Sequence, residues 1–352
     1  MRDGRAAVPG PPGIDADRVG EWLASHVERL TGPVAFGLVS GGRSNLTYRV
    51  TDAAGAGYAL RRPPMGGVLE TAHDMGREWR FISAMAGTDV PVAQPLAFCD
   101  DAAVTGAPFY VMGFVDGIVL ADRDAAERLS PEAKKNACES LVRVLVALHA
   151  IDPHEAGLGD MVRRTGFAER QLRRWRHQAH ESGAAYLPLL DEVHDLLAAR
   201  IPPQGTGIVH GDYRAGNLAF GPDGTVLAVF DWELATSGDA LADLGYLLST
   251  WQEPDDPAGA APRGPTTVPG FASREALAER YARLSGRDVS DLPYWVAFAQ
   301  WRSSCIGAGV QARYLAGHMA DDGYLAEARE RASLGVELAE KARAGLRAQE
   351  IR

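Results

Sequence analysis

The stretch HGDYRAGN, residues 210–217, is followed by DWE at residues 231–233, and a hairpin pattern separates the two motifs. The apolar runs LAF and VLAVF flank the sequence PDG at residues 222–224, which is typical of a hairpin turn. Because the two ends of a hairpin lie side by side, we expect polar residues of the first motif and Asp231 to converge on one site.

The three polar side chains of this region, Asp212, Asn217 and Asp231, suit phosphoryl transfer. Divalent cations prefer oxygen ligands, which an amide and a carboxylate can supply. A further carboxylate can orient an acceptor hydroxyl and take up its proton. A single Asp before a turn more often serves as a cap or an Asx-turn, but the ordered set of three favours the functional interpretation.

The motifs HGDYRAGN, VLAVFDWE and DALADLGY (residues 239–246) resemble the catalytic core of the aminoglycoside phosphotransferase and choline kinase superfamily. Members of this superfamily are relatives of the protein kinases. The resemblance extends from about residue 34 to about residue 320 and is closest to the branch that is fused to, or encoded near, acyl-CoA dehydrogenases. It implies ATP and Mg²⁺ as cofactors.

The resemblance assigns roles to residues of the catalytic loop. Asp212 matches the catalytic base, and Asn217 and Asp231 match the metal ligands. Arg214 stands where protein kinases have a lysine that contacts the transferred phosphate.

The resemblance also implies two supports for this loop. His210 matches a loop histidine with a scaffolding role, and Asp243 matches a buried acid that binds the backbone amides of the loop. His149, by contrast, is interpreted as a packed or capping histidine.

A glycine-containing loop, SGGRSN at residues 40–45, lies between two expected strands, where a kinase covers the phosphates of its nucleotide. Gly41 and Gly42 allow backbone N–H groups to approach phosphate oxygens, and Ser44 and Asn45 can add donors. Taken alone, Gly-Gly between strands is most often only a turn.

The strand YALR, residues 58–61, resembles the kinase strand that carries a phosphate-anchoring lysine. Arg61 occupies the lysine position, and Glu78 matches its acidic partner on the next helix. Lysine occurs only at positions 134, 135 and 341, so this role falls to arginine or is not filled at all. Arginine can bind carboxylate and phosphate in bidentate fashion. A surface salt bridge with no nucleotide role remains the alternative.

The segment MGFVDG, residues 112–117, resembles the hinge between the lobes of a kinase. By this resemblance, backbone groups of Gly113 and Val115 bind adenine in front of Met112. The plainer interpretation of the same segment is a buried strand that ends in a turn.

The order of the expected elements indicates a protein-kinase-like, two-lobed α+β fold. We expect a tail at residues 1–14, a nucleotide-binding lobe with a small antiparallel sheet at 15–115, and a mainly helical lobe at 116–352. Asp15 is the expected N-cap of a first helix, and a second helix is expected over residues 71–86. Expected strands include 34–40, 46–52, 58–62, 95–100 and 109–115, and long amphipathic helices are expected near 134–152 and 167–182.

Composition narrows the class of protein. The formal net charge of −10 argues against a nucleic-acid partner. No apolar run is long enough to span a membrane, and the N-terminal residues lack the apolar core of a secretory signal. The three cysteines form no CxxC pair. These features predict a cytoplasmic protein, and the oligomeric state stays open.

Four basic residues share one face of the helix expected near 167–182: Arg170, Arg173, Arg174 and His177. A solvated face is the favoured interpretation. The alternative is contact with an anionic substrate, such as a carboxylate or a coenzyme A ester.

We therefore expect an ATP-dependent phosphotransferase that acts on a hydroxyl of a small molecule, either an aminoglycoside or a hydroxyacyl compound. The main alternative is a non-catalytic, pseudokinase-type nucleotide-binding or scaffold protein, for which Arg61 is the only encouragement. A protein kinase is disfavoured because no APE motif closes an activation segment, and an acyl-CoA dehydrogenase because no flavin site is found.

Overall fold

The computed structural model describes residues 11–41, 45–65, 74–163, 166–316 and 324–349. The chain divides into two compact units. The first comprises Met1–Asp116 with the later segment Ala228–Glu233, and the second comprises Gly117–Leu227 with Leu234–Arg352. A linear boundary near residue 115 did not anticipate that residues 228–233 join the first unit.

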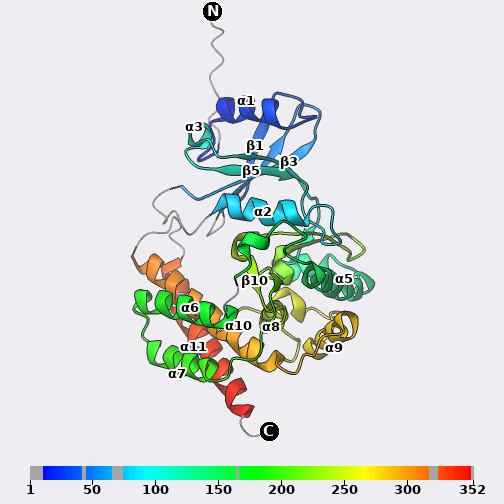
Figure 1. Ribbon diagram of the computed structural model, residues 1–352. Coiled ribbons are helices and arrows are strands. Elements are labelled where there is room, and N and C mark those ends of the chain that lie inside the picture. The colour runs from blue at the N-terminus through cyan, green and yellow to red at the C-terminus, as the bar shows by residue number, and fades with distance from the viewer. Residues whose placement is uncertain (1–10, 42–44, 66–73, 164–165, 317–323, 350–352) are drawn as a thin grey trace, which may run out of the picture. The chain divides into compact units, whose positions relative to one another are not determined.

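The first unit contains an antiparallel five-stranded sheet (Figure 1). In spatial order its strands are β1 (Ala35–Gly41), β2 (Leu46–Thr51), β3 (Gly57–Arg62), β5 (Phe109–Gly113) and β4 (Pro95–Cys99). Each expected strand is therefore present. Arg61 faces Thr47 on β2 and Tyr110 on β5 in the register of the sheet.

Two longer helices accompany this sheet, together with the short α3 (Ala102–Thr105). In α1 (Ala16–His26), Asp15 is the N-cap and accepts a hydrogen bond from the Arg18 N–H, as the sequence predicts. Val19 and Leu23 of α1 are buried in a core that includes residues of β2, β3 and β5. Helix α2 (Met75–Met85) begins after the N-cap Asp74, and residues 71–73 of the expected helix lie outside the described part of the chain.

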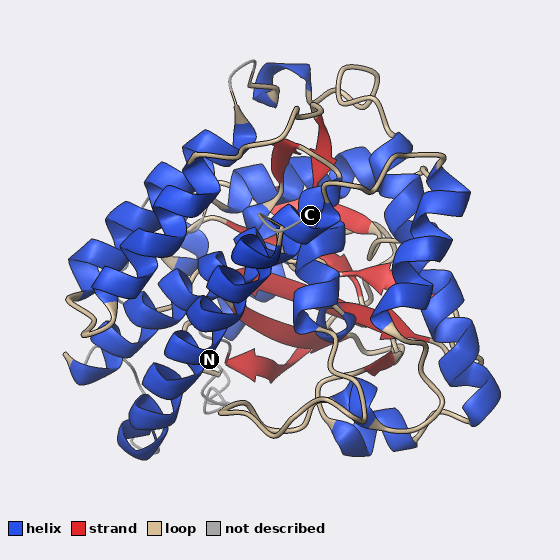
Figure 2. Ribbon diagram, turned by 90° about the horizontal axis from the view of Figure 1, so that it is seen from below, coloured by secondary structure: helices blue, strands red, loops and turns tan. Residues whose placement is uncertain are grey.

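Most elements of the second unit are helices, which are blue in Figure 2. Its helices are α4 (Arg123–Glu127), α5 (Pro131–Ala150), α6 (Phe167–Ser182), α7 (Leu187–Ala198), α8 (Leu241–Thr250), α9 (Arg274–Ser285), α10 (Leu292–Leu315) and α11 (Tyr324–Ala348). The two long helices expected near 134–152 and 167–182 correspond to α5 and α6. In the part of the chain that the structure describes, no helix has the length and apolarity that a membrane crossing requires.

Short strands position the motif at residues 210–217. Strand β7 (Gly207–Val209) pairs with β10 (Thr236–Gly238) and leads directly into the motif. The motif ends at β8 (Leu218–Phe220), which lies between β6 (Ile118–Val119) and β9 (Val226–Val229). The predicted hairpin is thus present, and its turn is closed by a hydrogen bond from the Gly221 N–H to the Thr225 carbonyl.

Candidate functional site

The buried carboxylate of Asp243 on α8 binds the backbone of the loop at residues 210–217. Asp243 accepts hydrogen bonds from the backbone N–H groups of His210 (2.7 Å) and Gly211 (2.8 Å). Burial by itself would raise the pKa of Asp243, but its bonds and the nearby histidines lower it below the ordinary value. This arrangement confirms the predicted role of Asp243 as a support of the loop.

Two histidines complete this support. His149 is buried and lies between Asp243 (Nε2 to Oδ2, 3.3 Å) and the Tyr281 hydroxyl (Nδ1 to Oη, 2.8 Å). His210 is fully buried, and its Nδ1 accepts a hydrogen bond from the Asp212 N–H (3.2 Å). Both histidines are therefore buried parts of the hydrogen-bond network that supports the loop.

The carboxylate of Asp212 is oriented by its neighbours in the second unit. Asn217 Nδ2 donates to Asp212 Oδ2 (2.7 Å) and to the Asp212 carbonyl (2.9 Å). Arg214 Nε lies 3.6 Å from Asp212 Oδ1. The structure therefore brings together Asp212, Arg214 and Asn217, all three of which the sequence singled out.

Two further residues reach this loop and were missed at the level of sequence. Tyr246, three residues after Asp243 on α8, lies beside the Asp212 side chain; burial and the Asp212 charge raise the pKa of Tyr246. Arg302 of α10 donates to the Gly211 carbonyl, and its guanidinium lies 4.6 Å from the centre of the Tyr246 ring. A single arginine in the middle of a long helix gives no sequence signal that it contacts a loop about ninety residues earlier in the chain.

The first unit gathers a second cluster around Arg61. The Arg61 guanidinium contacts Glu78 (Nε to Oε1, 3.0 Å) and Asp231 (Nη2 to Oδ1, 2.5 Å), and lies 4.0 Å from Glu233. Its side chain is 13% exposed and that of Glu78 is 1% exposed. The predicted Arg61–Glu78 pair is present, and it is not a surface salt bridge.

Charge and burial compete in this cluster. Burial by itself would lower the pKa of Arg61, but the carboxylates of Glu78, Asp231 and Glu233 raise it above the ordinary value. Burial raises the pKa of Glu78, and the charge of Arg61 opposes that rise. Tyr110 also forms a hydrogen bond with Glu78. Arg61 therefore stays a cation that neutralises several acids at once.

Asp231 has an unusual backbone conformation, with φ of 66°. A non-glycine residue in the left-handed region is uncommon and often marks a functional position. The segment is anchored within its unit by a hydrogen bond from the Val229 N–H to the Pro91 carbonyl (2.8 Å). Glu233, which the sequence did not single out, accepts a bond from Asn45 Nδ2 (3.3 Å).

The predicted phosphate loop is described only at its edges. Gly41 ends β1 and Asn45 is buried just before β2, while Gly42 and Ser44 lie outside the described residues. Its hydrogen bond to Glu233 therefore links Asn45 to the cluster of acids around Arg61.

The predicted hinge residues lie at the end of β5. Met112 is buried in the strand, as expected. The Gly113 N–H donates to the Gln94 carbonyl (2.9 Å), so this donor is already occupied. Val115 follows the strand and is only partly buried.

The candidate metal ligands have suitable atoms. Asn217 Nδ2 donates its hydrogen bonds to Asp212, so the Asn217 Oδ1 atom is the one available to a cation. Asp231 pairs with Arg61 through Oδ1, which leaves Oδ2. Both are oxygen donors, which Mg²⁺ prefers. The donor set therefore fits the metal that the sequence predicts.

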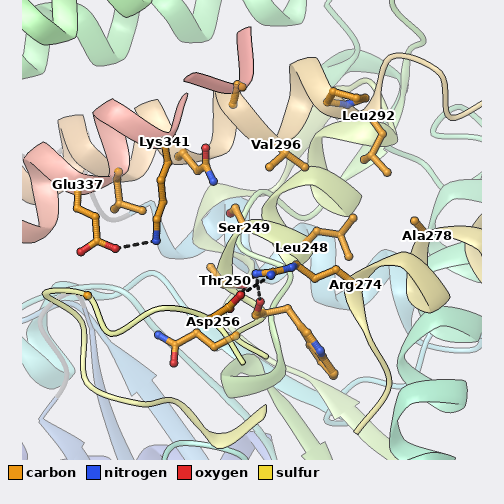
Figure 3. A pocket seen from close by; sticks show the side chains of 18 of the residues that line it. Leu248, Ser249, Thr250, Asp256, Arg274, Ala278, Leu292, Val296, Glu337 and Lys341 are labelled. Atoms are coloured by element: carbon orange, nitrogen blue, oxygen red, sulfur yellow. Dashed lines mark hydrogen bonds and ion pairs between the residues drawn. The ribbon is translucent and has the colours of Figure 1, made fainter. Parts of the chain in front are cut away.

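A cavity of about 920 Å³ lies among α8, α9, α10 and α11 of the second unit (Figure 3). None of the site residues predicted from sequence lines it. Two ion pairs lie on different sides of the cavity: Asp256 with Arg274 (2.5 Å), and Glu337 with Lys341 of α11 (2.6 Å). In the acidic loop at residues 253–256, Glu253 and Asp256 share the one cation Arg274, and Asp255 is exposed.

Comparison with known proteins identifies the family. The sequence model of the phosphotransferase enzyme family matches residues 36–295. Acyl-CoA dehydrogenase family member 11 of Gallus gallus is 32% identical over 307 residues, which cover 84% of this chain and 39% of that protein. The chain therefore spans about two-fifths of the length of this relative.

Solved structures agree. A Ralstonia eutropha JMP134 protein, provisionally designated an aminoglycoside phosphotransferase, is 32% identical, with a TM-score of 0.74 over 93% of this chain and 99% of that chain. A thermostable mutant of aminoglycoside phosphotransferase APH(4)-Ia, in a ternary complex with AMP-PNP and hygromycin B, is 18% identical. Its TM-score is 0.58 over 92% of this chain and 98% of that chain, a likeness of fold.

These matches confirm the predicted kinase-like α+β fold and the predicted relationship to the branch associated with acyl-CoA dehydrogenases, since family members 10 and 11 are among the relatives. The chain belongs to the phosphotransferase enzyme family, the family of the aminoglycoside phosphotransferases.

Proposed function

We propose that the protein transfers the γ-phosphate of ATP to a hydroxyl group of a small molecule. The observation that carries this proposal is the loop at residues 210–217, where Asp212 is fixed by Asn217 and supported by Asp243. Such a carboxylate, held on a rigid loop, is what a hydroxyl acceptor needs for orientation.

In the proposed reaction, Asp212 accepts the proton of the acceptor hydroxyl. The acceptor oxygen forms a bond to the γ-phosphorus, and the bond between that phosphorus and the bridging oxygen of ADP breaks. Arg214, which lies beside Asp212 and is partly exposed, is proposed to bind oxygens of the transferred phosphoryl group. Tyr246, beside the Asp212 side chain, limits the orientations of that carboxylate.

The nucleotide end is assigned to the first unit. Arg61 is proposed to bind ATP phosphate oxygens while Glu78 holds its guanidinium in place. Asn217 and Asp231 are proposed to supply oxygen ligands for Mg²⁺. The bound ion would neutralise phosphate charge during the transfer. Support for the use of ATP comes from the AMP-PNP complex of APH(4)-Ia.

Two acceptor classes are suggested by the relatives, hydroxyacyl compounds by the acyl-CoA dehydrogenase family members and aminoglycosides by the family name. Aminoglycosides are polycations and favour acidic pockets. The acidic loop that could serve them carries Glu253, Asp255 and Asp256, of which Glu253 and Asp256 share the single cation Arg274. The acceptors that test the proposal therefore include both classes.

A second candidate function is nucleotide binding without turnover. The observation that favours it is the 2.5 Å contact between Arg61 and Asp231, in which a cation of the protein already occupies a proposed metal ligand. The two candidates differ in one measurable property. The first requires formation of a phosphorylated acceptor, and the second requires binding of ATP alone.

Substitution of Asp212 by Asn tests the proposed function. With a panel of hydroxyacyl and aminoglycoside acceptors, we expect Asp212→Asn to lower kcat by at least about a thousandfold, because general-base catalysis and orientation are both lost. Calorimetry should show nearly unchanged affinity for Mg-ATP. Asp223→Asn, at the exposed hairpin turn, is the control and should keep wild-type turnover. Retained turnover in Asp212→Asn would overturn the assignment.

A further inference from the structure

Two arginines without an acidic partner line one small void beside the catalytic loop. Helices α6 and α10 pack together in the second unit (Figure 1), and the void lies where both approach Gly211. Its lining includes Arg174 and Gln171 from α6 and Arg302 from α10, and it contains no Asp or Glu. Among the described residues, no carboxylate forms an ion pair with either arginine.

Arg302 is the more deeply buried of the two, with 5% of its surface exposed. One of its terminal nitrogens donates to the Gly211 carbonyl, and its guanidinium lies over the Tyr246 ring. Its Nε is buried and has no hydrogen-bond partner among the described residues. A buried charge without a counter-charge is costly for a fold. The buried guanidinium of Arg302 beside the catalytic loop therefore points to a bound anion that supplies its missing counter-charge.

Two arginines of α6 add positive charge near the same void. Arg174 lines the void but, unlike Arg302, is exposed, and its guanidinium lies 4.7 Å from the centre of the Trp175 ring. Partial desolvation, together with the like charge of Arg302, lowers the pKa of Arg174. Arg170, one turn earlier, donates to the Ser237 carbonyl (3.4 Å) but keeps a buried Nη1 without a partner in the described chain. Positive charge is therefore concentrated on the side of α6 nearest to β10 and the catalytic loop.

We propose that the phosphate acceptor carries an anionic group, a carboxylate or a phosphate, that binds between Arg174 and Arg302. This inference rests on the proposed function, because it places the acceptor beside Asp212. The void has a volume of about 10 Å³, close to the minimum that holds one water molecule, so it accommodates a single anionic oxygen. Arg173 and Arg174 of this helix are both exposed, but only Arg174 lines the void.

Steady-state kinetics with matched acceptors test the proposal. Straight-chain hydroxycarboxylates are compared with the corresponding neutral diols, and glycerol 3-phosphate is compared with glycerol. Arg174→Gln should raise KM for the anionic acceptors by at least about tenfold, because a charge-assisted hydrogen bond is lost. It should leave KM for the neutral acceptors and the affinity for Mg-ATP unchanged.

Controls separate charge from structure. Arg173→Gln should leave every KM unchanged, and Arg174→Lys should recover part of the loss because the charge remains. Whether the hydroxycarboxylates or glycerol 3-phosphate depend on Arg174 distinguishes the carboxylate from the phosphate as the bound group. Equal KM values for anionic and neutral acceptors, unaffected by Arg174→Gln, would overturn the proposal.

A measurement of anion binding tests the anion site independently of the proposed function, because it requires no phosphate transfer. Acetate and inorganic phosphate are titrated at constant ionic strength, with thermal melting as the readout. Both the wild type and Arg173→Gln should be stabilised by one of these anions, and Arg174→Gln should not. Identical melting shifts in all three proteins would contradict the anion site. Absence of transfer to every acceptor would count against the proposed function alone, because melting requires no turnover.

Discussion

At the scale of single residues, Arg61 distinguishes this chain most clearly from the kinase pattern that it otherwise follows. The longer, planar guanidinium contacts Glu78 and Asp231 together, which a single ammonium would do less well. One residue thereby joins the acid of α2 to the proposed metal ligand. The arginine is consequently both a support of the first unit and the proposed phosphate anchor.

Replacement of this residue separates its two roles. We expect Arg61→Ala to weaken Mg-ATP binding by at least about tenfold, because charge-assisted bonds to phosphate are lost. It should also destabilise the protein by about 3 kcal/mol, because Glu78 would remain buried without its partner. Calorimetry and urea denaturation measure the two effects. The double variant Arg61→Ala/Glu78→Gln should regain stability but not affinity; a loss of affinity far below tenfold would leave Arg61 a purely structural role.

Gly211 is the second residue whose identity the structure explains. Its φ is +82°, and a Cβ at this position would lie 2.7 Å from the Leu234 carbonyl oxygen. We expect Gly211→Ala to cost about 2 kcal/mol and to lower kcat, because the loop must shift under Asp212. Gly183 is a matched control with φ of +63° and no atom within 4 Å of its Cβ position. Equal stability losses in Gly183→Ala and Gly211→Ala, measured by urea denaturation, would refute the steric argument.

At the scale of elements, α8 supports the catalytic loop through the ionised carboxylate of Asp243. Because the pKa of Asp243 is lowered, the unfolded chain binds its proton at higher pH than the folded protein does. The resulting stabilisation is complete above the unfolded value of about 3.9 and is lost as the pH falls through the lower folded value.

Asp243→Asn should therefore reduce the free energy of unfolding at pH 7 by about 3 kcal/mol and weaken its decline below about pH 4. Urea denaturation from about pH 2.5 to pH 7 would be the measurement. Asp239→Asn is the control, since Asp239 accepts backbone bonds from Gly205 and Leu241 and has no part in holding the loop. If the free energy of unfolding declines identically below about pH 4 in the wild type and in Asp243→Asn, this account is contradicted.

Elements with strong local signals were predictable from sequence. Asp15 marked the start of α1, and the Pro-Asp-Gly turn marked the hairpin of β8 and β9. The Arg61–Glu78 pair followed from the resemblance. Contacts that depend on tertiary packing were not predictable: Arg302 reaches Gly211 from a helix more than eighty residues later, and no local pattern encodes that approach.

At the scale of the whole molecule, the chain builds its first unit from two stretches that are far apart in sequence. Residues 228–233 belong to that unit because Val229 bonds to Pro91 and Asp231 pairs with Arg61. A boundary drawn at one sequence position cannot represent such a return, because the return depends on tertiary contacts between residues far apart in the chain. The return places Asp231 in the same unit as the proposed phosphate anchor.

Calorimetric titration of Mg-ATP into the wild type and the Asp231→Ala variant tests the central claim most directly. The account predicts binding that depends on Mg²⁺ in the wild type and is weakened at least about tenfold in the variant, because a proposed metal ligand is removed. Absence of binding in the wild type, with GTP tried as well, would contradict the assignment of this chain as an ATP-dependent phosphotransferase.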